Sequence, residues 1–284
     1  MASMRSIKRR KGSIQSTQQI TKAMKLVSTV KLQRAKGRAE KSKAYFECMY
    51  ATVKSVLAKV GAVEHPYLQT GEDGKKAVIV ITSNKGLAGG YNSNVIKLVT
   101  RGDFNKDDVK LYTIGRKGKD AFNRYGYEVA ADYSDMIEEP AYADAMRVSN
   151  ELLKAYEEGE INEIYLAYTA FKNTVSHVPT LLKLLPVDTD SVEEADESKA
   201  LMNFDQDEEE ALNMLIPKYV TSLIYGGMVE AVASENGARM QAMDSATSNA
   251  EEMIEKLSLQ YNRARQGSIT QELTEIIAGA EAIS

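Results

Sequence analysis

The hydrophobic positions of the first sixty residues recur at helical spacing. Intervals of seven, three and four residues separate Ile7, Ile14, Thr17, Thr21, Met24 and Val27. Such spacing over many turns is typical of a coiled-coil seam or of a long packed helix. The pattern predicts a helix over residues 3–60, which ends before the turn residues His65-Pro66 and Gly71 to Gly74.

The middle of the chain changes to the pattern of buried strands. Residues 77–82 form a continuous apolar run rich in β-branched residues, as in a buried parallel strand, and further strands are expected at 109–114, 161–171 and 178–187. Helical patterns at 94–100, 116–125 and 141–158 lie between them. Strands that alternate with helices predict an α/β domain over residues 75–187, with a mostly parallel sheet.

A second long helix is predicted at the C-terminal end. A short helical piece is expected over Glu208 to Ile216, and the long helix is expected to start at Pro217, because proline is tolerated in the first turn of a helix. At roughly 100 Å, this helix needs a partner along its length. Its predicted seam begins with small residues and continues with larger ones: Ala231, Ser234, Ala238, Ala242, Ser245 or Ala246, Ala250, Met253, Leu257, Tyr261 and Ala264. The helix over residues 3–60 is the other segment long enough to cover it.

These elements predict a mixed fold with both α+β and α/β character. A long antiparallel coiled coil of the N- and C-terminal helices carries an inserted Rossmann-like α/β domain. The expected boundaries are a basic helix at 1–60, the α/β domain at 75–187, an acidic linker at 188–210 and the C-terminal helix at 211–284.

The net charge of −4 conceals a strong asymmetry along the chain. Residues 1–43 carry thirteen Lys and Arg side chains and one acid, whereas residues 187–210 carry eleven Asp and Glu side chains and one base. The basic segment is compatible with nucleic-acid binding, an import peptide, a shaft that faces an acidic protein surface, or a solvated helix face. The acidic segment suits a solvent-exposed linker.

The cysteine content and the hydropathy of the chain indicate the cellular compartment in which it works. The single Cys48 excludes an intrachain disulfide and fits a reducing compartment. No apolar run approaches the ~18 residues that would suggest a membrane span. The first apolar positions are interrupted by basic residues, so no signal peptide is expected.

The usual catalytic and cofactor motifs are not matched. Gly86, Gly89 and Gly90 follow a predicted strand, but their spacing fits neither a P-loop nor a dinucleotide fingerprint. A tight strand-to-helix turn is the favoured interpretation. The two histidines, His65 and His177, have no second ligand type near them in sequence. We therefore expect no catalytic residues, no cofactor and no metal.

The end of the chain carries a polar group on an otherwise ordinary helix: Arg263, Arg265, Gln266, Thr270 and Glu275. This is either a solvated face or a surface that meets carboxylates of a surrounding protein, where Arg forks pair bidentately. Two other functions are weighed against a role in a protein assembly. A nucleic-acid-binding coiled coil would use the basic arm, and a small-molecule enzyme would hold its ligand near Gly86 to Gly90.

Three blocks of the sequence resemble the gamma subunits of F-type ATP synthases. They are Ile7-Lys8-Arg9-Arg10 with Thr21 to Val27, then Asn84 to Asn92, and a C-terminal block from Ala238 to Gln266 that continues as Ile269 to Ala282. The resemblance covers nearly the full length. The segment Ile269 to Ala282 is its most specific part.

The resemblance implies a central rotor stalk of the bacterial form, at the cytoplasmic face of the cell membrane as a peripheral protein. Its partners would be the three alpha and three beta subunits, the epsilon subunit and the membrane ring of c subunits. It implies no nucleic-acid partner, and membrane association only through the complex. Matching positions imply contacts with the catalytic ring at Met24, Lys25, Arg239, Arg265, Gln266, Thr270 and Glu275. The nucleotide chemistry would belong to the beta subunits.

Overall fold

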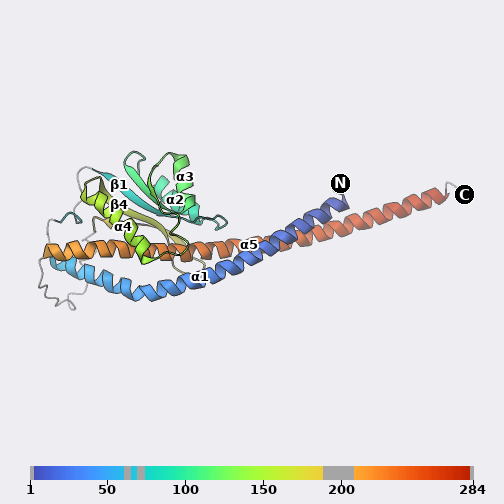
Figure 1. The fold of residues 1–284 in the computed structure, drawn as a ribbon. Coiled ribbons are helices and arrows are strands. Elements are labelled where there is room, and N and C mark those ends of the chain that lie inside the picture. Colours follow the sequence, from blue (N-terminus) through green and yellow to red (C-terminus); the bar gives the residue numbers. More distant parts are fainter. Residues whose placement is uncertain (1–2, 61–64, 69–73, 188–207, 282–284) are drawn as a thin grey trace. The chain divides into compact units, whose positions relative to one another are not determined.

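The computed structural model describes residues 3–60, 65–68, 74–187 and 208–281. The chain divides into two compact units, and Figure 1 shows the elements of both. One unit combines Met1–Ser28 with Met240–Ser284, and the other spans Thr29–Arg239. Most of the predicted acidic linker, residues 188–207, lies outside the described residues.

Two long helices supply most of the helical structure. Helix α1 spans Met4–Val60, as predicted, and α5 spans Glu208–Glu281. The predicted start of α5 at Pro217 is wrong, because the helix runs on through this proline. A proline inside a helix costs about 3 kcal/mol. Burial of Leu212, Ile216 and Val220 on one face offsets this cost, since tertiary packing outweighs local propensity.

The unit Thr29–Arg239 is built on a five-stranded sheet. Its strands are β1 (Lys75–Ile81), β2 (Val109–Ile114), β3 (Glu128–Asp132), β4 (Ile161–Phe171) and β5 (His177–Leu185), in the order β3-β2-β1-β4-β5. All neighbours are parallel except β4 and β5, which form an antiparallel pair. Sequence patterns missed β3, a short edge strand of alternating exposed and half-buried residues.

Helices cover both faces of this sheet (Figure 1). Helices α2 (Tyr91–Thr100) and α3 (Arg116–Tyr125) pack on one face, where Val78 and Val80 meet Val95 and Phe122. Helix α4 (Tyr142–Glu157) and the first part of α5 pack on the other face. The alternation along β1 therefore builds two separate apolar clusters, one on each side of the sheet.

The other unit is an antiparallel pair of helices. Gln18 bonds Glu251, Thr21 bonds Thr247, and Lys25 bonds Asp244. As the residue number rises by seven on α1, that of the partner on α5 falls by seven. The same register brings Met4, the first residue of α1, level with Arg265 on α5.

The buried seam of this pair differs in part from the predicted one. Ile7, Thr21 and Ser28 of α1 are buried, as are Met243, Thr247, Ala250 and Leu257 of α5. Several predicted seam residues point outward instead: Thr17 is exposed, Val27 is 58% exposed and Met253 is 50% exposed. The earlier small residues Ala231 and Ser234 lie in the unit Thr29–Arg239, where they are fully buried. The predicted fold class, an antiparallel pair of terminal helices with an inserted Rossmann-like domain, is confirmed.

Candidate functional site

Open α/β sheets bind ligands at the carboxyl ends of their strands, where the strand order reverses. Here that point lies between β1 and β4. Helix α5 crosses it closely: Gly227 packs on Leu166 and Ile81, and the Ser234 hydroxyl donates a 3.0 Å hydrogen bond to the Thr169 carbonyl. The chain's own helix therefore covers part of the edge where an enzyme of this fold would hold its substrate. This argues against the small-molecule enzyme considered from the sequence.

The glycine-rich loop after β1 is closed by its own hydrogen bonds. The Ser83 amide donates to Asn92 Oδ1 at 2.9 Å, and the Ser83 hydroxyl donates to the Lys85 carbonyl at 2.6 Å. Leu87 has a φ of 63°, in the left-handed region, and its side chain is exposed. The Ser83 donors are thus used inside the turn, which supports its interpretation as a strand-to-helix connection.

The charged groups at the strand ends are also paired within the chain. Lys119 Nζ lies 2.8 Å from Asp132 Oδ2, and the Ser134 hydroxyl donates to the same carboxylate. Burial alone would raise the pKa of Asp132, but the bonds from Lys119 and Ser134 lower it. Within the described residues, no group of three or more His, Cys, Asp or Glu side chains could hold a metal ion.

The two histidines are packing residues. His65 is buried, and its Nδ1 accepts a hydrogen bond from the Tyr67 amide. The His177 ring lies 5.9 Å from the Phe171 ring, and burial lowers the pKa of His177. No hydrogen bond from the described residues reaches Nε2 of either ring.

Arg239, one of the predicted ring contacts, is buried within the unit Thr29–Arg239. Its Nη2 lies 2.7 Å from Glu235 Oε1, and its guanidinium donates 3.3 Å hydrogen bonds to the carbonyls of Lys85 and Gly86. The side chain therefore ties α5 to the loop that follows β1. Its contacts in this structure are made inside the chain.

Met24 and Lys25 lie on the helix pair of the other unit. Met24 is half-buried, and the Lys25 Nζ lies 2.6 Å from Asp244 Oδ1. The Lys25 side chain is still 41% exposed. An ammonium group at this depth can attract a second anion on a neighbouring protein while it keeps its partner on α5.

The remaining predicted contacts lie on the tip of α5, which continues past the level of Met4. The tip, residues 266–281, rises about 24 Å and has no described segment of α1 beside it. Gln266, Thr270 and Glu275 are exposed, as is Arg265 at its base. Glu275 follows Gln266 by about two and a half turns, so these two side chains leave opposite faces of the helix. The polar groups surround the tip instead of forming one stripe.

The tip also carries an exposed apolar stripe that the residue-by-residue prediction did not include. Ile269, Leu273, Ile276 and Ile277 are all exposed. Their spacing of four, three and one places them together on a helical face, and this spacing is the signal that could have found them. An exposed apolar face at the end of an extended helix indicates a protein that surrounds or covers it.

Comparisons with known proteins agree over the whole chain. The family model described as ATP synthase matches residues 3–283. The chain is 63% identical to the ATP synthase gamma chain of Lachnoclostridium phytofermentans, with all of both sequences covered. It is 40% identical to the sodium ion specific ATP synthase gamma chain of Acetobacterium woodii, with 98% of each covered.

The fold is likewise similar to solved structures. One is a chain in the cryo-EM structure of the Euglena gracilis mitochondrial ATP synthase rotor in rotational state 1, with a TM-score of 0.67 and 16% identity. The match covers 94% of this chain and 98% of that one. On the family model and the full-length identities to bacterial relatives, the chain belongs to the family of ATP synthase gamma chains.

Proposed function

We propose that this chain is the central-stalk rotor of a bacterial ATP synthase. It couples rotation of the membrane c-ring, driven by an ion gradient, to the conformational cycling of three catalytic beta subunits that make or hydrolyse ATP. The observation that carries this proposal is the tip of α5, which extends past Met4 and exposes polar groups on several sides together with one apolar stripe. Membership of the gamma chain family supports the same role.

The tip suits a shaft that turns inside a ring. The apolar stripe of Ile269, Leu273 and Ile276 gives smooth contact, since apolar packing is non-directional. Arg265 and Glu275 offer charge-assisted hydrogen bonds at particular angles of rotation, together with the Gln266 and Thr270 side chains. As the shaft turns, each catalytic subunit meets a different side of the helix, and its nucleotide affinity changes in sequence.

The basic face of α1 adds an angle-dependent attraction. Met24 and Lys25 contact the alpha and beta subunits below the tip, where Lys25 meets acidic surface on the ring. Arg239 supports the ring contact from its own unit, by fixing α5 to the loop after β1. Salt would weaken the Lys25 contact, because the attraction between exposed charges decays over a Debye length of about 8 Å at physiological ionic strength and over a shorter length at higher salt.

The α/β unit is the foot of the stalk in this proposal, bound to the epsilon subunit and to the c-ring. No helix in the described part of the chain is long and apolar enough to cross a membrane. The protein would reach the cytoplasmic face of the cell membrane as a peripheral member of the complex. It needs no cofactor and no nucleic acid, because the nucleotide chemistry takes place on the beta subunits.

Affinity purification tests the assembly. A tagged copy of the chain, expressed in a cell that makes the other subunits, should copurify with alpha, beta and epsilon after detergent release. A variant that ends before Ile276 should assemble equally well but produce less torque, since it lacks the final apolar contacts. Loss of the assembled complex in this variant would refute the assigned role of the tip.

Coupling is tested with charge variants at the middle of the helix pair. Lys25→Gln together with Arg10→Gln should lower the number of ions pumped per ATP in reconstituted vesicles. Asp244→Asn is the matched control, because it breaks the same 2.6 Å ion pair and leaves the Lys25 charge in place. Equal pumping in all three proteins, or an equal loss in the control, would contradict an outward role for Lys25.

A further inference from the structure

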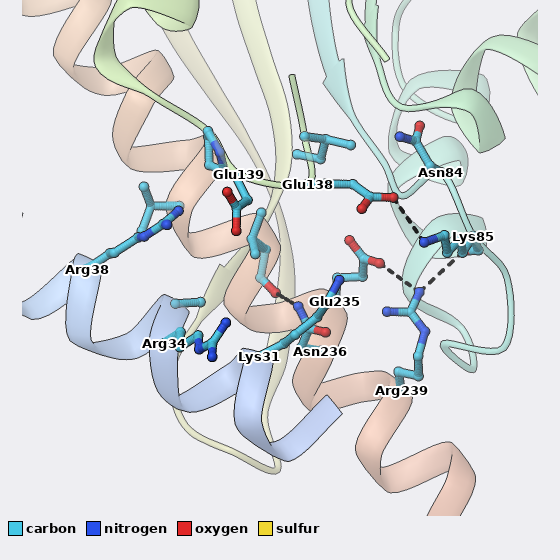
Figure 2. Close-up of a pocket in the computed structure, with 15 residues that line it drawn as sticks. Lys31, Arg34, Arg38, Asn84, Lys85, Glu138, Glu139, Glu235, Asn236 and Arg239 are labelled. Carbon is cyan, nitrogen blue, oxygen red and sulfur yellow. Dashed lines mark hydrogen bonds and ion pairs between the residues drawn. The ribbon is translucent and has the colours of Figure 1, made fainter. Parts of the chain in front are cut away.

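A pocket of about 180 Å³ lies inside the unit Thr29–Arg239. Figure 2 shows its walls, which come from α1, from α5, from the loop after β1 and from the segment between β3 and α4. Apolar side chains such as Ala35, Ile137 and Val229 form part of the lining. Most of the residues labelled in the view are charged, so electrostatics decides what the pocket can accept.

Two of the three carboxylates in the lining are already neutralised. Lys85 Nζ lies 3.1 Å from Glu138 Oε1 and lowers the pKa of Glu138. Arg239 lies 2.7 Å from Glu235. Glu139 is the one carboxylate of the lining without an ion pair among the described residues, although Lys31 of α1 also lies close enough to Glu138 and Glu235 to favour their charged forms.

Those cations are Lys31, Arg34 and Arg38, spaced by three and four residues on one face of α1. Within the described residues, neither arginine has a hydrogen bond or an ion pair. The lining holds five cations against three carboxylates, an excess of two positive charges. An excess of this size in a concave site matches a ligand with two negative charges.

The back of the pocket is rigid. The side chains of Arg239 and Asn236 are almost fully buried, and the Arg239 guanidinium is fixed by the Lys85 and Gly86 carbonyls. Among the described residues, Nη1 of Arg239 donates no hydrogen bond, since the contacts of this side chain are made by Nε and Nη2. A preorganised guanidinium loses little freedom on binding, so it can hold an anion without a large entropic cost.

The pocket volume selects a compact ligand. Sites for drug-sized molecules have volumes of about 300–1,000 Å³, so a whole nucleotide would not be enclosed here. A single phosphate group fits, and arginine forks match its oxygens bidentately. Arg34 and Arg38 would bind from α1, while Arg239 binds from α5.

We propose that this pocket binds a phosphate group, either free inorganic phosphate or the terminal phosphate of a nucleotide. The bound group would bridge α1, α5 and the segment before α4, three parts of one unit that are distant in sequence. Binding would therefore hold these three segments together and stiffen the unit. The fraction of molecules stiffened in this way would rise with the phosphate concentration. This goes beyond the proposed rotor function, which would stand if the pocket were empty.

The test uses the purified full chain. Inorganic phosphate should raise its melting temperature in a saturable way, because a ligand that binds only the folded state stabilises it by mass action. Potassium chloride at matched ionic strength is the control for screening, and succinate is the control for a dicarboxylate. Phosphorus NMR titration then gives the dissociation constant. Metal-free ATP in a separate arm shows whether a nucleotide tail binds at the same site.

Variants locate the site. Arg34→Gln with Arg38→Gln should weaken phosphate binding by about tenfold or more, since each charge-assisted hydrogen bond contributes over a kcal/mol. Lys36→Gln, on the same helix and outside the lining, should bind as the parent does. Arg34→Lys with Arg38→Lys keeps the charge and the fold but loses the forks, so it should also bind more weakly.

Three results would overturn the proposal. One is a phosphate response no larger than that of potassium chloride. Another is equal phosphate affinity in the double Gln variant and in Lys36→Gln. The third is succinate binding as tight as phosphate binding, which would mark a nonspecific basic surface. Competition by ATP for the same site would assign the nucleotide tail as an alternative source of the phosphate group.

Discussion

Replacing Arg239 with alanine should destabilise the unit Thr29–Arg239 strongly. The guanidinium forms a 2.7 Å ion pair with Glu235, and the two side chains are only 11% and 14% exposed. Removing one partner of a buried ion pair costs about 3–5 kcal/mol, because the other charge stays buried without compensation. Its hydrogen bonds to Lys85 and Gly86 are 3.3 Å long and contribute less. With slight exposure of both groups, we expect a loss of about 3 kcal/mol.

The size of this loss should depend on pH. Burial raises the pKa of Glu235 even with Arg239 beside it, and without the arginine the pKa rises further. An acid whose pKa is raised in the folded state contributes stability below its unfolded value of 4.5, and this is lost as pH rises through the folded pKa. Arg239→Ala should therefore be nearly tolerated near pH 4.5 and most damaging at neutral pH. Adding Glu235→Gln should restore much of the neutral-pH stability.

Hydrogen exchange of the full chain measures this locally. Amides of residues 77–81 in β1 report the opening free energy of this unit, and residues 243–257 serve as the internal control from the other unit. The reasoning would be refuted by a loss below about 1 kcal/mol. It would also fail if the loss were equal at about pH 5 and pH 7.5, or if the double variant were no more stable than Arg239→Ala.

The remaining predictions concern both units. Gly237→Ala would bring its Cβ into overlap with the His177 ring, so overpacking of about 1–3 kcal/mol outweighs a helix-propensity gain of at most about 1 kcal/mol. At Gly267 an added Cβ meets no atom within 4 Å, so Gly267→Ala should stabilise α5 by up to about 1 kcal/mol in thermal unfolding. A Gly237→Ala protein more stable than Gly267→Ala would contradict the packing around these glycines. Burial lowers the pKa of His177 in the folded state below its unfolded value of 6.5. The free energy of unfolding should therefore be highest above pH 6.5 and fall as the pH drops through the folded pKa, by at most about 1.4 kcal/mol per pH unit. His177→Gln should remove this pH dependence when the free energy of unfolding is measured by urea titration at several pH values. An unchanged dependence on pH would contradict the role of His177. Thr247→Val should cost below about 1 kcal/mol in the helix pair, since the Thr21 hydroxyl keeps its bond to its own helix; a loss above about 2 kcal/mol would show a stronger role for the 2.7 Å hydroxyl pair.

The elements with strong periodicity could be predicted from the sequence. Spacings of three, four and seven residues predicted α1 to within one residue, a continuous β-branched run predicted β1, and strand-like segments predicted β2, β4 and β5. The edge strand β3 could not be predicted in the same way, because an exposed edge does not select a clear apolar pattern. The start of α5 was missed for a related reason: a local rule for proline cannot include burial of Leu212 and Ile216.

The candidate site shows the same division. Sequence patterns located the polar groups of the α5 tip, since these are properties of one helix and need no partner. The pairing of Arg239 with Glu235 was also within reach, because the two are four residues apart. The contact between Arg239 and Lys85 could not be predicted in this way, because the two residues are 154 positions apart in the sequence.

Local periodicity and composition are enough to predict the two long helices, the central α/β domain and the concentration of basic charge on α1. Which side chains face inward depends on how these elements pack. The packing buries Arg239, turns Met253 outward, places α5 over part of the ligand-binding edge of the sheet, and brings Arg34 and Arg38 opposite Asn236 around one pocket. The physical reason is that burial and electrostatic compensation depend on contacts between segments far apart in the chain, and these exist only once the packing has formed.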